Sequence, residues 1–152
     1  MDSVENPPTA SMRRLDRRQR TLALLVAGAI ALVFLLARWL TPDDRGLGTH
    51  EQLGLAPCRM LSLFHIPCPF YGMTTSFSLM VRGEAVRAFF VQPAGALIFI
   101  LCAGIAIGAI ASAIAGRCPD KVLRLGSDKR ALILLGASVA LSWGYKIATH
   151  GM

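Results

Sequence analysis

The sequence predicts an all-α membrane protein with three transmembrane helices and a re-entrant or interfacial helical turn between the first and second helices. Three observations lead to this fold class. Only 16% of the 152 residues are charged, against roughly 25% in a soluble domain. The hydrophobic share is 54%, and most of it lies in long stretches without any charge. The net charge of +7 gathers beside those stretches. These proportions exclude a disordered chain and a soluble basic domain.

Each predicted transmembrane helix has close to the roughly 20 apolar residues that cross a bilayer. The sequence begins with a basic tail at residues 1–20, followed by a first helix at 21–40 and an outer connection at 41–92. A second helix at 93–115, a basic loop at 116–130 and a third helix at 131–149 follow. Trp39 ends the first helix, and Trp143 and Tyr145 lie near the end of the third, as is typical of residues at a membrane interface.

The basic residues predict how the helices are oriented. Ten of the 16 lie before the first helix or between the second and third: Arg13, Arg14, Arg17, Arg18, Arg20, Arg117, Lys121, Arg124, Lys129 and Arg130. Three crossings place both groups on one side, which the positive-inside rule makes cytoplasmic. We therefore expect a bacterial inner-membrane protein with a cytoplasmic N-terminus and an outer C-terminus. The first helix has no small-x-small cleavage pattern after it and is expected to remain as an anchor.

The outer connection contains a fourth charge-free stretch, Met60–Val81. Counting it as a crossing would move the basic loop at 116–130 outside. Pro67, Pro69 and Gly72 would also break a helix in its middle. We expect this stretch to pack against the transmembrane helices, because non-helical backbone at membrane depth must be buried in protein or line a cavity.

Two short helices are expected in the rest of the connection. Thr74 is the predicted N-cap of the first, and Gly83 ends it. Its apolar face would contain Met73, Phe77, Met80 and Val81. The second short helix is expected over residues 84–91, directly before the proline that opens the second transmembrane helix.

Small residues recur at every fourth position of the second and third predicted helices. They are Gly104, Gly108 and Ser112 in one, and Gly136, Ala140 and Gly144 in the other. Such ridges allow helix backbones to approach closely. Packing of the two helices within one chain is the simpler expectation, and self-association of two copies is the alternative.

Several residues of the connection form a motif: Cys58, then Cys68-Pro69-Phe70-Tyr71-Gly72-Met73-Thr74-Thr75, then Gly83-Glu84 and Gln92-Pro93. This pattern resembles the bacterial integral-membrane family of unknown function that is marked by Cys-Pro-x-Cys-Gly-x-Thr-Arg. The resemblance implies a membrane protein without an established activity. Tyr71 stands where the family has its second cysteine, and Thr75 where it has arginine, so a Cys-x-x-Cys pair is absent.

The motif and its neighbours supply the candidate functional residues: Cys58, His65, Pro67, Cys68, Pro69, Tyr71, Gly72 and Thr74. Cys58 and Cys68 lie on the predicted oxidising side, where a disulfide would stabilise the fold by about 2–3 kcal/mol. Two buried thiols are the alternative. A zinc site using Cys58, His65 and Cys68, with His50 nearby, is a weaker hypothesis because the spacing is loose.

These features predict a non-enzymatic role, and no cofactor is expected. The predicted transmembrane helices contain no acidic residue that could relay protons, and there is no glycine-rich phosphate loop. The expected partners are the lipid bilayer, another membrane protein or a second copy, and not nucleic acid. We expect a small subunit or scaffold that binds a membrane partner or lipid. The alternative is a redox or metal-handling protein centred on Cys58, His65 and Cys68.

Overall fold

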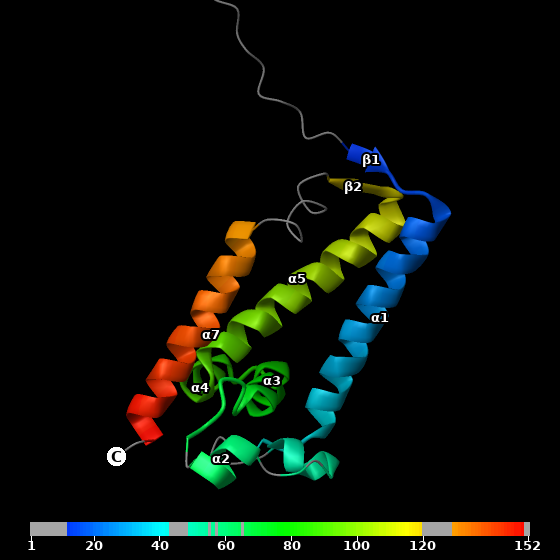
Figure 1. The fold of residues 1–152 in the computed structure, drawn as a ribbon. Helices are drawn as coiled ribbons and strands as arrows, with labels where there is room; N and C mark the ends of the chain where they lie inside the picture. The colour runs from blue at the N-terminus through cyan, green and yellow to red at the C-terminus, as the bar shows by residue number, and fades with distance from the viewer. Residues whose placement is uncertain are drawn as a thin grey trace, which may run out of the picture.

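The computed structural model describes residues 12–42, 49–54, 56, 58–64, 66–119 and 129–150. The elements in chain order are β1 (Met12–Arg14), α1 (Arg17–Trp39), η1 (Thr49–Leu53), α2 (Arg59–Phe64), α3 (Met73–Val81), α4 (Ala85–Val91), α5 (Pro93–Ala115), β2 (Arg117–Pro119) and α7 (Lys129–His150). In Figure 1, α1 and α5 converge at the end that carries β1 and β2. The short helices lie toward the other end, and α7 lies beside α5 on the side away from α1.

Two helices, α1 and α5, are long and apolar enough to cross a membrane. Each has 23 residues, and only 11% of its apolar window is buried. The core helix of a soluble protein would be mostly buried, whereas these helices expose large apolar side chains such as Leu35 and Ile114. Their length and exposure suggest a membrane location. The fold-class prediction is confirmed as mostly helical with two candidate spans, because the apolar part of α7, Ile133–Ala148, is shorter.

The boundaries of the long helices follow from local chemistry. Asp16 accepts a hydrogen bond from the Arg17 main-chain N–H, and the Gln19 side chain accepts one from the Asp16 N–H, so a capping box starts α1. Pro93 opens α5, where its fixed φ suits a first helical turn. Gly116 ends α5 with a φ of 66°.

Two arginines satisfy the carbonyls left open at opposite ends of the α1–α5 pair. Arg20 of α1 donates from Nε and Nη2 to the Ala113 carbonyl, at 2.8 and 2.6 Å. Arg82, which follows α3, donates from Nη2 to the Arg38 carbonyl at 2.9 Å. Since the last carbonyls of a helix have no partner within the helix, each arginine fastens one helix end to a neighbouring element.

The helix α3 connects α1 and α5 through aromatic rings. Phe34 of α1 stacks on Phe99 of α5 with ring centroids 4.3 Å apart. Phe77 of α3 meets both rings edge-on, at 6.4 and 5.4 Å. Leu79, Ala88 and Ala96 form a buried apolar cluster between α3, α4 and α5. The short helices are therefore packed against the long ones, as predicted for a stretch that does not cross the membrane itself.

A two-stranded antiparallel sheet adds a feature that the all-α prediction lacked. Arg14 of β1 pairs with Arg117 of β2, and Arg13 pairs with Cys118. Each strand has three residues, too few to show an alternating pattern in the sequence. The pairing depends on α1 and α5 lying antiparallel, because only then do the chain before α1 and the chain after α5 meet.

The glycines of the predicted small-residue ridges on α5 and α7 lie in open space in the described part of the chain. A Cβ added at Gly104, Gly108, Gly136 or Gly144 would meet nothing within 4 Å in the described part of the chain. Ala140 is exposed, and Ser112 is buried beside α1. The most extensive contact of α5 is with α1. Self-association through the exposed ridges stays a prediction.

The helix that follows the Cys-Pro turn begins two residues earlier than predicted. Gly72, with a φ of 84°, is the N-cap of α3, and Thr74 is the second residue of the helix. The left-handed conformation at Gly72 turns the chain directly into the helix, a conformation that a residue with a Cβ rarely adopts. Gly83, with a φ of 82°, follows the end of α3 as predicted.

Candidate functional site

The turn between α2 and α3 is held by side chains from α5 and α7. Three alternate main-chain carbonyls of the turn accept hydrogen bonds: Pro67 from Trp143 Nε1 at 2.8 Å, Pro69 from Gln92 Nε2 at 2.9 Å, and Tyr71 from Lys146 Nζ. The two carbonyls between them, of Cys68 and Phe70, accept main-chain hydrogen bonds from Tyr71 and Met73, so donors on the neighbouring helices complete the bonding of the turn. We call residues 67–72 the braced turn.

Gln92 and Lys146 are buried, whereas Trp143 is half-buried. Gln92 is fully buried, and its Oε1 accepts a hydrogen bond from Ser142 Oγ at 3.2 Å. Ser76 Oγ lies within 3.3 Å of the main-chain oxygen of Gln92 and within 3.2 Å of that of Ala88. The amide of Gln92 therefore joins the braced turn to α7, and its backbone joins α3 to α5. Such a connected network fixes the relative positions of its members.

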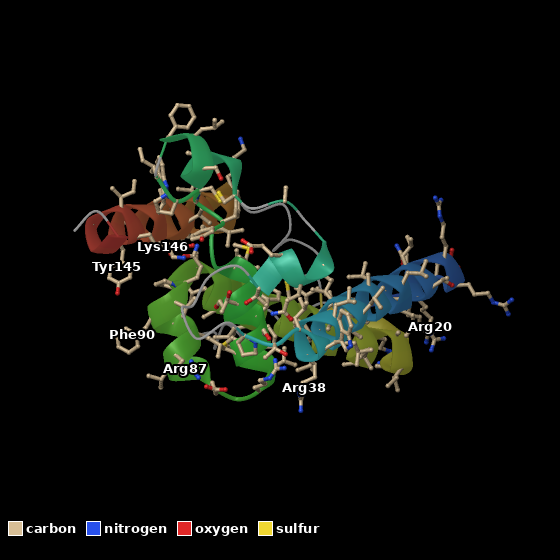
Figure 2. The ribbon with its side chains drawn as sticks, turned by 90° about the horizontal axis from the view of Figure 1, so that it is seen from below. Arg20, Arg38, Arg87, Phe90, Tyr145 and Lys146 are labelled. Atoms are coloured by element: carbon tan, nitrogen blue, oxygen red, sulfur yellow. The ribbon has the colours of Figure 1, made fainter. Side chains whose placement is uncertain are left out.

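The side chain of Lys146 enters the protein rather than the solvent. Its exposed fraction is 1%, and Nζ lies 5.5 Å from the centroid of the Tyr71 ring, so the ammonium meets both the ring face and the carbonyl of one residue. Figure 2 shows Lys146 between α7 and the connection, whereas Tyr145 extends away from the molecule. Tyr145, which is predicted at a membrane interface, is 45% exposed.

The buried face of α3 consists mainly of small hydroxyl side chains. Thr75 shares a hydrogen bond of 2.8 Å with Thr49 of η1, and Ser78 donates to the Leu40 carbonyl at 2.7 Å. Arg82 Nη1 in turn donates to Ser78 Oγ at 2.6 Å. The predicted apolar residues of α3, such as Met73 and Met80, are only half-buried. The hydroxyls therefore connect α3 to the chain that leaves α1.

Cys68 of the braced turn lies close to a second thiol, that of Cys58. Cys58 and Cys68 line a cavity of about 200 Å³ together with residues of the turn and of α3, including Thr74. A hydrogen bond joins the two thiols. Burial raises the pKa of the Cys68 thiol above its ordinary 9.0, and the contact with Cys58 raises it further. The main-chain N–H of Phe70 and the charge of Lys146 lower that pKa. Cys68 therefore stays protonated near neutral pH.

The hypothesis of a metal site gains no support from the described residues. Among them, no three His, Cys, Asp or Glu side chains lie close enough together to hold a metal ion. His65 lies outside the described residues, and the side chain of His50 is also outside them. The structure places the proposed ligands Cys58 and Cys68 together, and the contribution of a histidine stays untested.

Cys58 and Cys68 are part of the segment that the comparisons match. Residues 58–106 match the family model described as Protein of unknown function (DUF2752). This confirms the resemblance predicted from the cysteines, Gly72 and the residues before α5. The DUF2752 match covers the braced turn, the two helices after it and the first part of α5. Neither the curated proteins nor the solved structures contain a match to the chain.

Part of the candidate site lies outside the DUF2752 match. Gln92 is inside it, whereas Trp143, Ser142 and Lys146 belong to α7, beyond its end. In the sequence, Gln92 is part of the family pattern, and no pattern predicts a role for Ser76, Ser78 or Ser142. A hydroxyl carries little weight in a search for apolar periodicity. The signal that could have identified these serines is the number of uncharged polar residues in segments that are otherwise apolar.

Proposed function

We propose that this protein is an integral membrane protein with three transmembrane helices that acts as a non-enzymatic docking subunit, presenting the braced turn to a membrane partner. The single observation that carries the proposal is the bonding of alternate turn carbonyls to Trp143, Gln92 and Lys146. A surface held in one conformation before binding loses less entropy when a partner docks.

The third crossing is supported by the position of α7. It has 22 residues, starts at the end of the molecule that carries β1 and β2, and runs toward the end that carries the connection (Figure 1). Trp143 and Lys146 hold its second half to the braced turn. If α1 and α5 cross in opposite directions, the predicted basic loop at 116–130 would lie on the same side as the N-terminal tail. The positive-inside rule then makes that side cytoplasmic.

The docking surface would consist of the apolar side chains around the braced turn. Leu63 and Phe64 of α2 are 71% and 66% exposed, and Phe70 of the turn is 60% exposed. The apolar residues of α1 and α5 would be covered by lipid tails. Leu63, Phe64 and Phe70 lie outside these candidate spans and need another apolar partner. Aromatic residues are enriched at protein interfaces. The proposed occupant is an apolar face of another membrane protein on the outer side.

The raised pKa of the Cys68 thiol favours docking over thiol catalysis. The nucleophile in thiol chemistry is the thiolate, and reactive cysteines have lowered pKa values. Burial moves the pKa of Cys68 the other way, and the neighbouring Cys58 adds to this effect. A protonated, half-buried thiol suits a structural position better than a catalytic one.

One observation favours a second candidate function, which is redox exchange at the thiol pair. Cys58 and Cys68 are already in contact and share a cavity. Two such thiols can pass two electrons and two protons to the disulfide of a partner protein, which becomes a dithiol while Cys58 and Cys68 form a disulfide. Mass spectrometry after alkylation of unreduced membranes tests this state. Recovery of both cysteines as alkylated thiols would contradict the disulfide.

The docking proposal is tested by photo-crosslinking in intact membranes. A photoreactive amino acid at Phe70 should give one discrete crosslinked protein, whereas the same residue at Phe90 serves as the control. Phe90 is 71% exposed on α4 and extends away from the molecule in Figure 2. Crosslinks to lipid alone from both positions would show that the turn faces the bilayer and would overturn the proposal.

The number of crossings is tested separately with reporters. A reporter fused after Gly126 should be active only in the cytoplasm, and one fused after Met152 only outside. A cytoplasmic signal from both fusions would show that α7 does not cross. An outer signal after Gly126 would show that the count of crossings before it is wrong.

A further inference from the structure

A groove runs between α1 and α5 at the end of the molecule opposite the braced turn. Its volume is about 310 Å³, within the ~300–1,000 Å³ typical of ligand sites. Its walls include Leu22 and Val26 from α1 and Ile105 and Gly108 from α5. Leu15 and Cys118 lie at its end, beside the strands. The groove is therefore an apolar channel that follows the helices for several turns.

Small residues of α5 leave this space open. A Cβ added at Gly108 would meet nothing within 4 Å, and the next residue, Ala109, also lines the groove. Larger side chains at these positions would fill the channel. The groove is thus a consequence of the same small-residue spacing that predicts a helix-packing ridge, and within the described chain no helix occupies it.

Exposed arginines lie on β1, on β2 and in the first turn of α1, the segments that meet near Leu15 and Cys118. Arg14 and Arg117 are cross-strand neighbours and both are exposed, which is an unfavourable pairing of like charges. Arg17 and Arg18 are exposed in the first turn of α1. Asp16 is the acidic residue of this segment, and it accepts the hydrogen bond that starts α1. An anion beside the strands would offset the repulsion.

We propose that the groove binds one acyl chain of an anionic phospholipid, whose phosphate is held by the exposed arginines around Arg14, Arg18 and Arg117. An apolar channel that ends in a basic surface matches a molecule with an apolar tail and a negative head. This inference rests on the proposed membrane location, in which the arginines lie at the cytoplasmic surface. It is independent of the docking role, because the braced turn lies at the opposite end of the long helices (Figure 1).

The proposal is tested with the full chain in detergent, by native mass spectrometry during titration with phosphatidylglycerol or phosphatidylcholine. The wild-type protein should retain one phosphatidylglycerol molecule with at least about tenfold preference. Gly108→Leu should reduce retention about tenfold by filling the groove. Gly104→Leu is the matched control, because Gly104 is on the same helix, is equally open and does not line the groove.

A second pair of variants tests the headgroup. The double variant Arg14→Gln/Arg18→Gln should bind the two lipids alike, whereas Arg38→Gln should keep the preference. Arg38 is exposed near the other end of α1, where Figure 2 also places it far from Arg20. Thermal unfolding of each variant establishes that it is folded.

Three results would overturn the proposal. Equal retention of both lipids by the wild-type protein would remove the headgroup site. Equal retention by Gly108→Leu and Gly104→Leu would place the lipid elsewhere. A mass of two chains that is lost only in Gly108→Leu would show that a second copy occupies the groove. The reporter fusions tell these outcomes apart from a failure of the membrane topology, since they do not depend on lipid binding.

Discussion

Lys146 of α7 donates a hydrogen bond to the main-chain carbonyl of Tyr71 and lies over the ring of the same residue. The two residues are 75 positions apart in the chain, and both are buried. An ammonium group has three donors and no acceptor, so a carbonyl and a ring face suit it. The contact gives a non-helical stretch a partner for its backbone, which is the condition for placing such a stretch beside membrane helices.

Replacing Lys146 by methionine should loosen the braced turn. The change keeps most of the side-chain volume and leaves the Tyr71 carbonyl without its donor, a loss of about 1–3 kcal/mol in the free energy of unfolding. We expect a lower Tm in detergent and faster hydrogen exchange of the turn. Lys129→Met is the control, because Lys129 is exposed at the start of α7. Equal effects of the two variants would contradict a bracing role for Lys146.

Substitution by alanine should lower the stability of the protein at Gly95 of α5 and raise it at Gly104 of the same helix. A Cβ at Gly95 would lie 3.0 Å from both Cβ and Oγ of Ser76, so Gly95→Ala must displace α3 or break the hydrogen bonds of that serine. The expected loss is about 1–3 kcal/mol. Gly104→Ala meets open space and should stabilise the helix by about 0.5–1 kcal/mol. Thermal unfolding followed by circular dichroism measures both. A neutral Gly95→Ala would mean that α3 and α5 are less closely packed.

Arg82→Met should separate α3 from the end of α1. The guanidinium bonds Ser78 Oγ and the Arg38 carbonyl, and charge-assisted hydrogen bonds contribute about 1.5–3 kcal/mol. Arg87→Met is the control, since Arg87 is exposed and its ion pair with Glu84 is expected to contribute only about 0–1 kcal/mol. We predict a clear fall in Tm for Arg82→Met alone. Similar small shifts in both would show that the helix end does not need this donor.

The alkylation of Cys68 should need an unusually high pH. Because alkylation follows the thiolate, its rate should reach half of the maximum above pH 9.0. Cys58→Ala removes the hydrogen bond and the neighbouring charge, which both raise the pKa, so the midpoint should move down. Site-resolved mass spectrometry of iodoacetamide labelling measures both midpoints.

The raised pKa of Cys68 also makes the stability of the protein depend on pH. A pKa that is raised on folding means that the folded protein holds the proton more tightly. The stabilisation from the protonated thiol is then fully present below pH 9.0 and is lost as the pH rises through the raised pKa. An alkylation midpoint of Cys68 below 9.0 would contradict both statements and would favour the redox function instead.

Much of the helical structure could be predicted from the sequence. The prediction of residues 93–115 agrees with α5 at both ends, because a proline and a glycine delimit it. The start of α1 was predicted late, at residue 21 instead of Arg17, since charge rather than capping set the limit. The N-cap of α3 was misplaced at Thr74 because a left-handed glycine can start a helix without a side-chain bond.

The candidate site was predictable only in part. The sequence pattern placed function at the Cys-Pro turn, and the DUF2752 match covers that turn. It did not indicate which residues hold the turn. Lys and Trp are residue types that are common at membrane interfaces. Lys146 and Trp143 donate to the carbonyls of the turn because the tertiary structure brings α7 next to it. The small residues of α5 were interpreted as a contact with α7, whereas the groove beside Gly108 faces α1.

The sequence by itself determined where the long helices lie and which stretch interrupts them. Apolarity and charge act locally, so a run of residues carries that information without its neighbours. The tertiary structure alone decided that Gln92 and Lys146 meet the braced turn, that Cys58 meets Cys68, and that the glycines of α5 leave a groove. Each of these depends on the rotation of one helix about its axis relative to another. That rotation is set by packing between segments distant in the chain, which no local pattern encodes.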